Sequence, residues 1–393
     1  MKLIKSELNN EILTVGLQGH IDSNNAADVE AEITEARSSG DIKNVVIDMQ
    51  DLQYISSAGL RILLRLKKIY PELRVVNVSS EVYEVLNITG FTEMMNVQKA
   101  YRELSVEGCE VIGQGANGKV YRIDADTIVK VYFKPDALPD IERERELART
   151  ALILGIPTAI PYDIVKIGEG YGSVFELLNA KSFAKLIQDD PGKTDEVIAM
   201  SVDLLKKIHG TLVNPDKMPD MKKVAQNWAA FLKDYLPEEN FNKLVSLVDA
   251  VPEDLHMLHG DYHLKNIMLQ DEEVLLIDMD TLCTGHPVFE FASVFNAYQG
   301  YSELDHDNMM QFLGIPYETG AHIWEKTLEL YFDGRSREEI AEIADKAKLI
   351  GYTRNMRRLI RRDVLENEKG RAEVENCKKH ILELTVKLDT LTF

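Results

Sequence analysis

Cysteine is scarce in this sequence, and long hydrophobic runs and excess positive charge are missing. The three cysteines, Cys109, Cys283 and Cys377, lie far apart and do not have the spacing of metal ligands. This pattern favours reduced thiols in the cytoplasm. No stretch approaches the roughly 20 apolar residues that a membrane-spanning helix needs, and the first residues lack the apolar run of a signal peptide. We therefore expect a soluble, cytoplasmic protein.

Negative charge dominates the composition. The 65 acidic side chains outnumber the 45 lysines and arginines, for a formal net charge of -20. Such a protein repels nucleic acid and anionic membrane surfaces, so neither is an expected partner. One basic cluster breaks the pattern, between Arg354 and Arg362. We interpret this cluster as a solvated helix face, and the alternative is a docking patch for an anionic segment.

The 393 residues suggest two to three domains, without internal repeats or a low-complexity linker. Residues 1–100 alternate between strand and helix patterns. Leu13, Val15 and Leu17 alternate as in a half-buried strand, and residues 45–47 form a short apolar run typical of a covered strand. Strands separated by helices predict an α/β domain whose sheet contains parallel pairs.

The rest of the chain changes character twice. Residues 105–178 have mostly strand patterns, interrupted by one helix at about 139–155. Residues 179–393 have mostly helical patterns, and the exception is a short hairpin near 266–278. The sequence therefore predicts three regions: an α/β domain, a strand-rich lobe and a helical lobe.

Three glycines, Gly113, Gly115 and Gly118, fit the pattern G-x-G-x-x-G. Glycines let the backbone approach a phosphate closely and adopt positive φ angles. A dinucleotide-binding fold requires a helix directly after this pattern, but residues 119–123 have the pattern of a strand. This order favours a strand–loop–strand flap over ATP, as in kinases. The alternative is a glycine-rich hairpin without a ligand.

A lysine and a glutamate are expected to form an ion pair. Lys130 lies in the middle of an apolar strand, where a charge needs a partner. Glu144 falls on an otherwise apolar face of the next helix: Ile141, Ala148, Ala151 and Leu152. We expect the two to pair, with Lys130 binding the α- and β-phosphates of a nucleotide. The alternatives are a lysine at a solvent edge and a glutamate in water.

The strongest signal is the segment His259–Asn266 followed by a predicted hairpin. The hairpin geometry places Asn266, before its first strand, beside Asp278, after its second, with Asp261 near the same end. Carboxylate and amide oxygens are ligands that magnesium prefers. We expect Asn266 and Asp278 to hold Mg²⁺ and Asp261 to accept or orient the proton of an attacking hydroxyl. Ordinary turn residues are the alternative.

Together these residues resemble the aminoglycoside phosphotransferase and choline kinase branch of the protein-kinase-like fold, over about residues 105–300. The resemblance implies a two-lobed kinase, with an N-lobe at 105–178, a C-lobe at 179–393 and ATP between them. The residues that it assigns to the nucleotide are Gly113, Gly115, Gly118, Val120, Lys130, Glu144 and, through backbone groups that meet adenine, Glu176 and Leu178.

The segment after Asp278 differs from that of typical protein kinases. Asp278 is followed by Met279-Asp280 instead of Phe-Gly, and Gly285-His286-Pro287 comes soon afterwards. This spacing leaves no room for a long activation loop. A typical eukaryotic-type protein kinase is therefore excluded.

The segment Asp51–Leu60 and the earlier Leu17–Asp22 resemble STAS domains of the anti-sigma factor antagonist class, over about residues 3–98. In that family, the serine at the position of Ser57 is phosphorylated by a partner kinase, which switches protein binding. This sequence has Ser56 where those antagonists usually have aspartate. From the residues alone, either serine is a natural N-cap for a helix that begins at Ala58, and a helix N-terminus also favours a bound phosphate.

The predicted protein is thus an α/β (α+β) chain, with a STAS-like α/β domain before a two-lobed, protein-kinase-like domain whose C-lobe is mostly helical. The predicted function is ATP- and Mg²⁺-dependent transfer of phosphate to an alcohol group of a small molecule or a protein, Ser57 included. The STAS domain would regulate the kinase, serve as its substrate or bind a protein partner.

Two other functions stay open. The first is an ATP-sensing pseudokinase that switches partners in anti-sigma-type signalling, but the intact set of Lys130, Glu144, Asp261, Asn266 and Asp278 argues against it. The second is a purely structural partner-switching protein, which leaves these five residues unexplained. The acceptor, the phosphorylation of Ser57 and the oligomeric state are not determined by the sequence.

Overall fold

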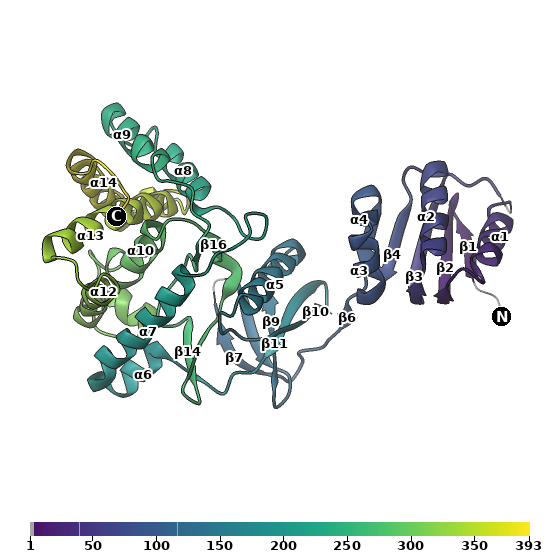
Figure 1. Ribbon diagram of the computed structural model, residues 1–393, viewed down its shortest axis with the longest axis horizontal. Coiled ribbons are helices and arrows are strands. Elements are labelled where there is room, and N and C mark those ends of the chain that lie inside the picture. The colour runs from purple at the N-terminus through teal and green to yellow at the C-terminus, as the bar shows by residue number, and fades with distance from the viewer. Residues whose placement is uncertain (1–3, 39, 116) are drawn as a thin grey trace. The chain divides into compact units, whose positions relative to one another are not determined.

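The computed structural model describes residues 4–38, 40–115 and 117–393. The chain divides into two compact units, which are coloured along the sequence in Figure 1. Unit 1 comprises the residues up to Ser105 together with Ile164–Glu169, and unit 2 comprises Val106–Asp163 and Gly170–Phe393. Among the described residues, no helix is both long enough and apolar enough to cross a membrane.

Unit 1 is built on a five-stranded sheet with the order β1-β2-β3-β4-β5. Its strands are β1 (Ile4–Asn9), β2 (Ile12–Ile21), β3 (Asn44–Ile55), β4 (Arg74–Val78) and β5 (Asn96–Lys99). Its helices are α1 (Ala26–Arg37), α2 (Ser57–Ile69), α3 (Ser80–Ile88) and α4 (Phe91–Met94). Only the β1–β2 pair is antiparallel and the other three pairs are parallel, which confirms the predicted α/β alternation.

The core of unit 1 follows from its hydrophobic pattern. Val15 on β2 lies opposite Ile47 on β3, and both are fully buried. Strand β3 is longer than the apolar run suggested, because it continues to Ile55 and leads directly into α2. Leu60 and Leu63, one turn apart on α2, are buried against this core. The strand–helix junction at Ser56 and Ser57 is therefore anchored from both sides.

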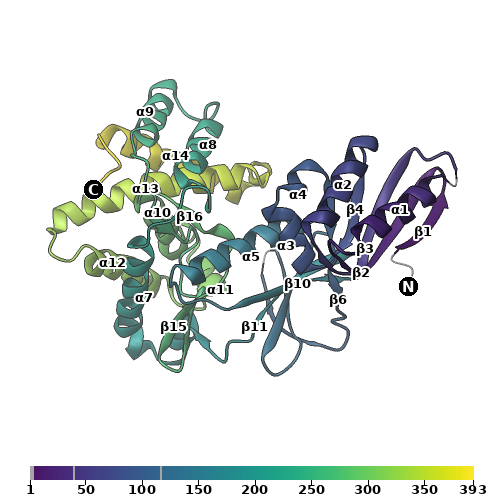
Figure 2. The same ribbon diagram turned by 45° about the vertical axis from the view of Figure 1, so that its right-hand side comes forward.

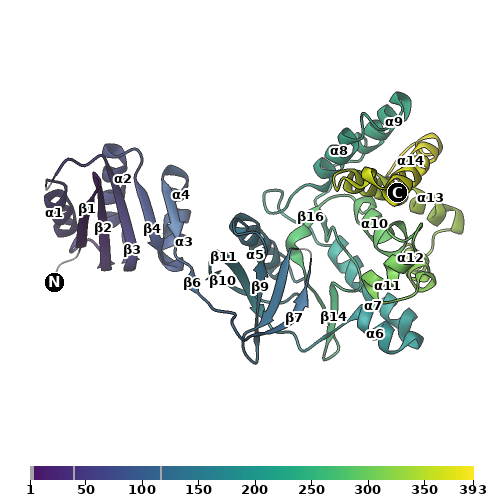
Figure 3. The same ribbon diagram turned by 180° about the vertical axis from the view of Figure 1, so that it is seen from behind.

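A second sheet has six strands in the order β6-β10-β11-β9-β8-β7. Its strands are β6 (Arg102–Glu103), β7 (Glu110–Gln114), β8 (Gly118–Arg122), β9 (Thr127–Tyr132), β10 (Pro161–Ile167) and β11 (Gly170–Glu176). Helix α5 (Leu138–Ile153) lies beside β11 (Figures 2 and 3). One prediction for this helix is wrong: Leu152 is exposed, and Leu147 completes the buried face instead.

The remainder of unit 2 is mainly helical. Its α-helices are α6 (Phe183–Asp189), α7 (Thr194–His209), α8 (Met221–Phe231), α9 (Glu238–Asp249), α10 (Val288–Phe295), α11 (Asp307–Leu313), α12 (Tyr317–Tyr331), α13 (Arg337–Ile360) and α14 (Glu368–Lys387). Four short 3₁₀ or π turns complete it: η1 (Pro191–Lys193), η2 (Met279–Thr281), η3 (Asn296–Gly300) and η4 (Val364–Glu366).

The expected hairpin is present as β14 (Ile267–Gln270) and β15 (Glu273–Leu276). The sequence predicted this hairpin as the only strand structure in the helical lobe, but the lobe contains further short strands. Strand β12 (Lys181–Ser182) pairs with β14, and β13 (Met257–Leu258) pairs with β16 (Cys283–Thr284). Two-residue strands have too little periodicity to be read from a pattern.

Helix α13 passes through the core of unit 2 and contacts α10 and α14. Gly351 allows the close approach of α10, because a Cβ atom there would lie 2.6 Å from a ring carbon of Phe295. Phe295 also packs its ring against Trp324 and Tyr352. These contacts fix α10 and α13 relative to each other, and both helices supply side chains to the site described below.

The basic cluster on α13 is not the solvated helix face that the sequence suggested. Three of its arginines are half-buried and lie over aromatic rings: Arg354 over Trp228, Arg357 over Phe231 and Arg358 over Tyr301. Only Arg361 and Arg362 are exposed. Rings from α8 and from the segment after η3 cover the apolar stems of these arginines, and such packing between distant segments leaves no mark in the local sequence.

Candidate functional site

The β14–β15 hairpin brings together two predicted metal ligands. The Ile277 N–H donates to the Asn266 carbonyl at 2.9 Å, so the residues on either side of the hairpin meet at its open end. Asn266 begins one side and Asp278 follows the other. Asp278 has a positive φ of 62°, which turns the chain sharply out of the hairpin.

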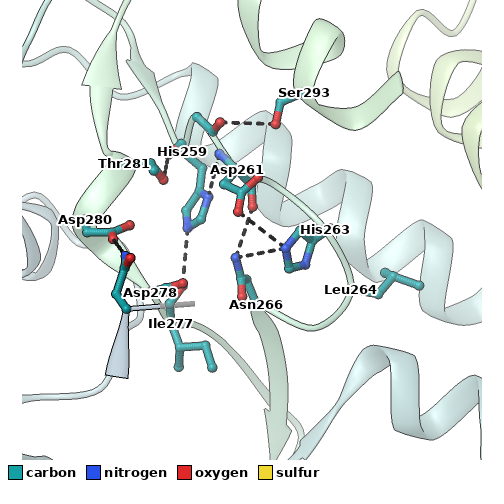
Figure 4. A network of polar contacts seen from close by, with 12 residues as sticks. His259, Asp261, His263, Leu264, Asn266, Ile277, Asp278, Asp280, Thr281 and Ser293 are labelled. Carbon is teal, nitrogen blue, oxygen red and sulfur yellow. Dashed lines mark hydrogen bonds and ion pairs between the residues drawn. The ribbon is translucent and has the colours of Figure 1, made fainter. Parts of the chain in front are cut away.

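Asp261 lies on the loop that precedes the hairpin (Figure 4). The Asn266 amide nitrogen donates to the Asp261 carbonyl at 3.1 Å and lies 3.4 Å from His263 Nε2. No hydrogen-bond partner of the Asn266 amide oxygen is present among the described residues. This oxygen is therefore free to act as a ligand, and the Asp278 carboxylate offers a second hard oxygen, so the donor set fits Mg²⁺.

A buried carboxylate holds the loop that carries Asp261. Glu290, on the first turn of α10, is 0% exposed and accepts the N–H groups of His259 and Gly260, the latter at 3.0 Å. Gly260 has a φ of +79°, and a Cβ atom there would lie 2.5 Å from the Thr281 carbonyl. A glycine is needed at this position for both reasons.

Further hydrogen bonds tie the same loop to three elements. The Tyr262 hydroxyl donates to the Ser201 carbonyl on α7 at 2.6 Å. The Leu264 N–H donates to the Tyr298 hydroxyl at 3.0 Å. The Ser293 hydroxyl of α10 donates to the Gly260 carbonyl at 3.1 Å. The loop is thus fixed by the helical lobe before any ligand binds.

The His259 ring connects the two halves of the site (Figure 4). Its Nδ1 accepts the Asp261 N–H at 3.3 Å, and its Nε2 donates to the Ile277 carbonyl at 3.3 Å. These partners fix which ring nitrogen carries the proton. His259 thereby sets the position of Asp261 relative to the strand end that precedes Asp278.

Two basic side chains lie close to the Asp261 carboxylate. His263 Nε2 lies 3.5 Å from one oxygen, and Arg354 Nη2 lies 3.9 Å from the other. Burial by itself would raise the pKa of Asp261, but the hydrogen bond and charge of His263, with the charge of Arg354, lower this pKa to about 2. Asp261 is therefore ionised at every pH at which the protein is expected to work.

The predicted ion pair between Lys130 and Glu144 is present. Lys130 Nζ lies 2.9 Å from Glu144 Oε1, and Glu144 is only 3% exposed. Lys130 also donates to Asp278 Oδ1 at 2.9 Å, which joins the strand-rich lobe to the hairpin end. The Tyr132 hydroxyl donates to the other Glu144 oxygen. Burial would lower the pKa of Lys130, but Glu144 and Asp278 raise it above its usual value.

The glycine-rich segment forms a strand–loop–strand unit, as predicted. Gly113 pairs with Val120 across β7 and β8, and the Gly115 N–H donates to the Gly118 carbonyl at 3.0 Å. Ala116, within the motif, lies outside the described residues. The expected positive φ angles are absent from the three glycines. Gly118 is needed for another reason: a Cβ atom there would lie 2.2 Å from the Val131 carbonyl.

Three more sequence-predicted nucleotide residues, Val120, Glu176 and Leu178, lie on strands of the same sheet or just after one. Val120 is directly opposite Lys130 in the β8–β9 pair, so the two side chains share one face of the sheet. Glu176 ends β11, where its N–H donates to the Ile160 carbonyl at 3.1 Å. The Leu178 N–H has no hydrogen-bond partner within the described part of the chain, so it can bind a ligand.

Asp280 adds a third carboxylate on the Asp278 side. Its carboxylate lies 3.4 Å from the Asn117 amide nitrogen, which belongs to the glycine-rich loop. Burial and the charge of Asp278 raise the pKa of Asp280 to about 7, against the opposing effect of Lys130. Closely spaced carboxylates of this kind favour the binding of a cation.

Ser57 in unit 1 lies in a different setting. Ser56 is the N-cap of α2, because its side-chain oxygen accepts the Ala58 N–H at 3.2 Å. Ser57 is the first residue of the helix and is exposed. The first turn of α2 contains no acidic residue, so its partial positive charge is uncompensated there.

The comparisons with known proteins agree with this architecture. The model of the phosphotransferase enzyme family (APH) matches residues 108–324, which is more than half of the chain. The chain belongs to the phosphotransferase enzyme family. Its phosphotransferase region contains every residue of the Lys130–Asp278 network.

The STAS domain model matches residues 4–104. A relative in this region is BtrV of Bordetella bronchiseptica, whose name assigns it to the anti-sigma factor antagonists. It is 36% identical over 101 residues, which cover 25% of this chain and 85% of that protein. The chain therefore combines a STAS domain with a phosphotransferase domain.

Solved structures of similar fold include aminoglycoside phosphotransferase APH(4)-Ia, in a ternary complex with ADP and hygromycin B. It is 12% identical, with a TM-score of 0.49, and covers 72% of this chain and 94% of that chain. A choline/ethanolamine kinase family protein from Mesorhizobium loti is 16% identical, with a TM-score of 0.47, and covers 70% and 87%. Because these identities and TM-scores are low, the family assignment rests on the match to the phosphotransferase family model.

Three residues of the site were not predicted from the sequence. Arg354 was read as part of a solvated face, but it donates to the Gly260 carbonyl at 3.0 Å. Neither Glu290 nor Tyr132 was given a role from the sequence. One signal in the sequence would have identified Tyr132. It ends the apolar strand that carries Lys130, where a hydroxyl is costly to bury without a partner.

Proposed function

We propose that this chain is an ATP- and Mg²⁺-dependent kinase that transfers the γ-phosphate of ATP to a hydroxyl group. The observation that carries the proposal is the bonding of Lys130 to two carboxylates from different lobes: Glu144, which is buried, and Asp278, which is exposed at the end of the hairpin. Burying the Lys130–Glu144 pair is costly, and a cluster of charges shared between two lobes is a candidate site for a common ligand. A polyphosphate with its metal ion is such a ligand.

Each residue has a role in this proposal. Lys130, oriented by Glu144, binds the α- and β-phosphates. Asn266 and Asp278 would hold Mg²⁺, which neutralises charge on the transferring phosphate. The loop with Gly113, Gly115, Gly118 and Val120 covers the nucleotide, and the backbone groups of Glu176 and Leu178 bind adenine.

Asp261 acts on the acceptor. The acceptor oxygen forms a bond to the γ-phosphorus while the bond to the β–γ bridging oxygen breaks, and ADP leaves with that electron pair. The hydroxyl proton passes to the Asp261 carboxylate and then to solvent. With a pKa of about 2, Asp261 is a weak base, so its main contribution is to orient the hydroxyl and to receive the proton late.

The acceptor is a small molecule or a protein hydroxyl. Ser57 is the protein candidate, because it is exposed and lies at the start of α2, where the free N–H groups favour a phosphate. Similarity to an anti-sigma factor antagonist supports a STAS domain that binds a protein partner and that regulates, or is modified by, the kinase. A cytoplasmic location is part of the same proposal.

A phosphotransfer assay tests the proposal. The full chain is incubated with γ-labelled ATP, Mg²⁺ and a panel of hydroxyl acceptors, and intact mass is measured in parallel. Asp261→Asn is expected to lower transfer by about 10²- to 10⁴-fold. Asp271→Asn is the matched control, because Asp271 is an exposed residue in the turn of the same hairpin and tolerates asparagine at its positive φ.

The outcomes separate the candidate functions. Transfer that depends on Asp261 but not on Asp271 supports the kinase, and label on Ser57 that is lost in Ser57→Ala identifies the STAS domain as a substrate. ATP binding without transfer to any acceptor would reject the kinase in favour of an ATP-sensing protein.

A further inference from the structure

The basic cluster on α13 contains one arginine that faces the proposed active site. Helix α13 lies beyond residues 108–324, which match the phosphotransferase family model. Arg354, Arg357 and Arg358 each lie over an aromatic ring. In the described part of the chain, Arg354 alone of these three also contacts the loop that carries Asp261. Packing against a ring is therefore common to the cluster, whereas the contact with the loop is particular to Arg354.

The Arg354 guanidinium is held at two points. Its Nη1 group donates to the Gly260 carbonyl at 3.0 Å, and its central carbon lies 5.4 Å from the centre of the Trp228 ring. An aromatic ring contacts the face of a guanidinium and leaves the N–H groups at its edge available. The position of the charge is thus fixed by the fold, while most of its donors stay unused.

The second terminal nitrogen of Arg354 points toward the Asp261 carboxylate without binding it directly. Nη2 lies 3.9 Å from Asp261 Oδ1, which is longer than an N–H···O hydrogen bond. No other hydrogen bond of Arg354 is present among the described residues. The Arg354 side chain is 21% exposed and that of Asp261 is 39% exposed, so a ligand can reach both groups.

The loop that carries Asp261 is anchored without Arg354. The Gly260 carbonyl also accepts the Ser293 hydroxyl at 3.1 Å, and the Gly260 N–H donates to Glu290 at 3.0 Å. The Tyr262 hydroxyl ties the same loop to α7. A neutral donor would be enough for the carbonyl, so the anchoring of the loop does not explain why a permanent charge lies beside Asp261.

The proposed reaction requires a positive charge at this place. It brings the Asp261 carboxylate and the γ-phosphate of ATP to opposite sides of one hydroxyl group, where two anions repel each other. Lys130 contacts Asp278 at the hairpin end. On the Asp261 side, the basic groups are His263, which is buried, and Arg354. Because an arginine stays charged at every working pH, Arg354 supplies a permanent cation there.

We propose that Arg354 is a catalytic residue whose Nη2 group contacts the phosphoryl group during its transfer, while Nη1 stays on the Gly260 carbonyl. The proposal rests on the kinase function proposed above. The acceptor oxygen still bonds to the γ-phosphorus, ADP leaves with the bridging oxygen, and the hydroxyl proton still passes to Asp261. Arg354 keeps its own protons throughout and stabilises the negative charge on the phosphoryl oxygens.

This role predicts an effect on turnover with little effect on nucleotide binding. A donor that meets charge mainly in the transition state raises kcat, whereas a donor that binds the ground state equally well changes KM. In Arg354→Gln, kcat should fall about 10²- to 10³-fold, the loss seen when one preorganised donor is removed. Arg354→Lys keeps a charge but not the forked geometry, so its kcat should lie between those of Arg354→Gln and wild type.

Steady-state kinetics on the full chain test the inference. The probe is γ-labelled Mg·ATP, and phosphoryl transfer to water and to the panel of hydroxyl acceptors is measured together. Mg·ATP affinity is measured by calorimetry on the same samples. Arg357→Gln is the matched control, because Arg357 lies on the same helix over the Phe231 ring and has no contact with Asp261 among the described residues. It should keep the kcat of wild type.

Chemical rescue separates a catalytic charge from a structural one. Millimolar guanidinium ion, added to Arg354→Ala, should restore part of its kcat in a saturable manner and should not raise the kcat of Arg357→Ala. If the glutamine and alanine variants do not fold, Arg354→Lys decides, because its shorter side chain withdraws the donor from the transferred group. In that variant, kcat is expected below that of wild type at unchanged Mg·ATP affinity.

Several results would overturn the inference. They are a wild-type kcat in Arg354→Gln or Arg354→Lys, an equal loss in Arg357→Gln, a loss confined to KM, or an Arg354→Ala variant that guanidinium does not rescue. Transfer that depends on Asp261 but not on Arg354 rejects only this inference. A wild-type chain that binds Mg·ATP and transfers no phosphate rejects the kinase proposal, and the role of Arg354 with it.

Discussion

The two candidate phosphate sites of this chain differ in how much of their polar chemistry is already paired. In unit 2, Glu290 and Glu144 are buried carboxylates whose partners are all provided by the fold. In unit 1, Ser57 is an exposed hydroxyl at a helix start, and the fold uses its neighbour Ser56 as the cap. One site is preorganised, and the other is a simple surface group.

This difference has a physical cause. A site that stabilises charge during a reaction must hold its dipoles in place beforehand, and the cost of burying them is met by mutual hydrogen bonds. A residue that only receives a phosphate needs exposure and a favourable local field. Mutations should therefore have large effects in the first region and small effects in the second.

The largest effect is expected at Glu290. Glu290→Ala leaves the N–H groups of His259 and Gly260 buried without acceptors, which should lower the free energy of unfolding of unit 2 by about 2–5 kcal/mol. Tryptophan fluorescence in urea measures this selectively, because Trp228 and Trp324, the only tryptophans, both lie in unit 2. Glu290→Gln keeps an acceptor and should cost less, so equal losses in both variants would contradict the account.

The next effect concerns nucleotide binding. Lys130→Met removes the donor shared by Glu144 and Asp278, and Mg·ATP affinity should fall about 10- to 100-fold, as expected for a charge-assisted contact. Isothermal titration calorimetry measures the change. Lys119→Met, on the neighbouring strand, serves as the control. Unchanged affinity in Lys130→Met would show that the network is only structural.

A smaller effect is expected at Tyr132. Tyr132→Phe removes the hydroxyl that donates to Glu144 and should destabilise unit 2 by about 1–3 kcal/mol, because one buried carboxylate oxygen loses a partner. Urea unfolding followed by tryptophan fluorescence reports the change. Tyr162→Phe, at an exposed position on β10, is the matched substitution and should leave the urea midpoint of unfolding unchanged.

The smallest effect separates the two serines of unit 1. Ser56→Ala removes the N-cap of α2 and should cost about 1 kcal/mol, while Ser57→Ala should cost less than about 0.5 kcal/mol. Amide hydrogen exchange of the α2 peptides measures both, since unit 1 contains no tryptophan. A larger loss in Ser57→Ala would mean that Ser57, not Ser56, supports the helix.

Sequence patterns predicted the elements that have strong local periodicity. The β14–β15 hairpin, the parallel sheet of unit 1 and the Lys130–Glu144 pair follow from alternation, helical spacing and the cost of a lone buried charge. The roles of the site residues stay predictions, because no ligand or activity has tested them.

The missed features depend on contacts between distant segments. Arg354 reaches Gly260 across 94 residues, and Glu290 reaches the same glycine across 30. The role of Gly118 also differs from expectation: it makes room for the Val131 backbone and does not adopt a positive φ. Neither spacing nor composition contains this information, which exists only once the chain is packed.

Mg·ATP binding to the Asp278→Asn variant tests the central claim most directly. Calorimetry on the full chain, with and without Mg²⁺, compares this variant with wild type and with Asp271→Asn at the hairpin turn. The account predicts that wild type and Asp271→Asn bind ATP more tightly with Mg²⁺, and that Asp278→Asn loses most of this gain, at least about tenfold. An undiminished Mg²⁺-dependent affinity in Asp278→Asn would contradict the proposed metal–nucleotide site.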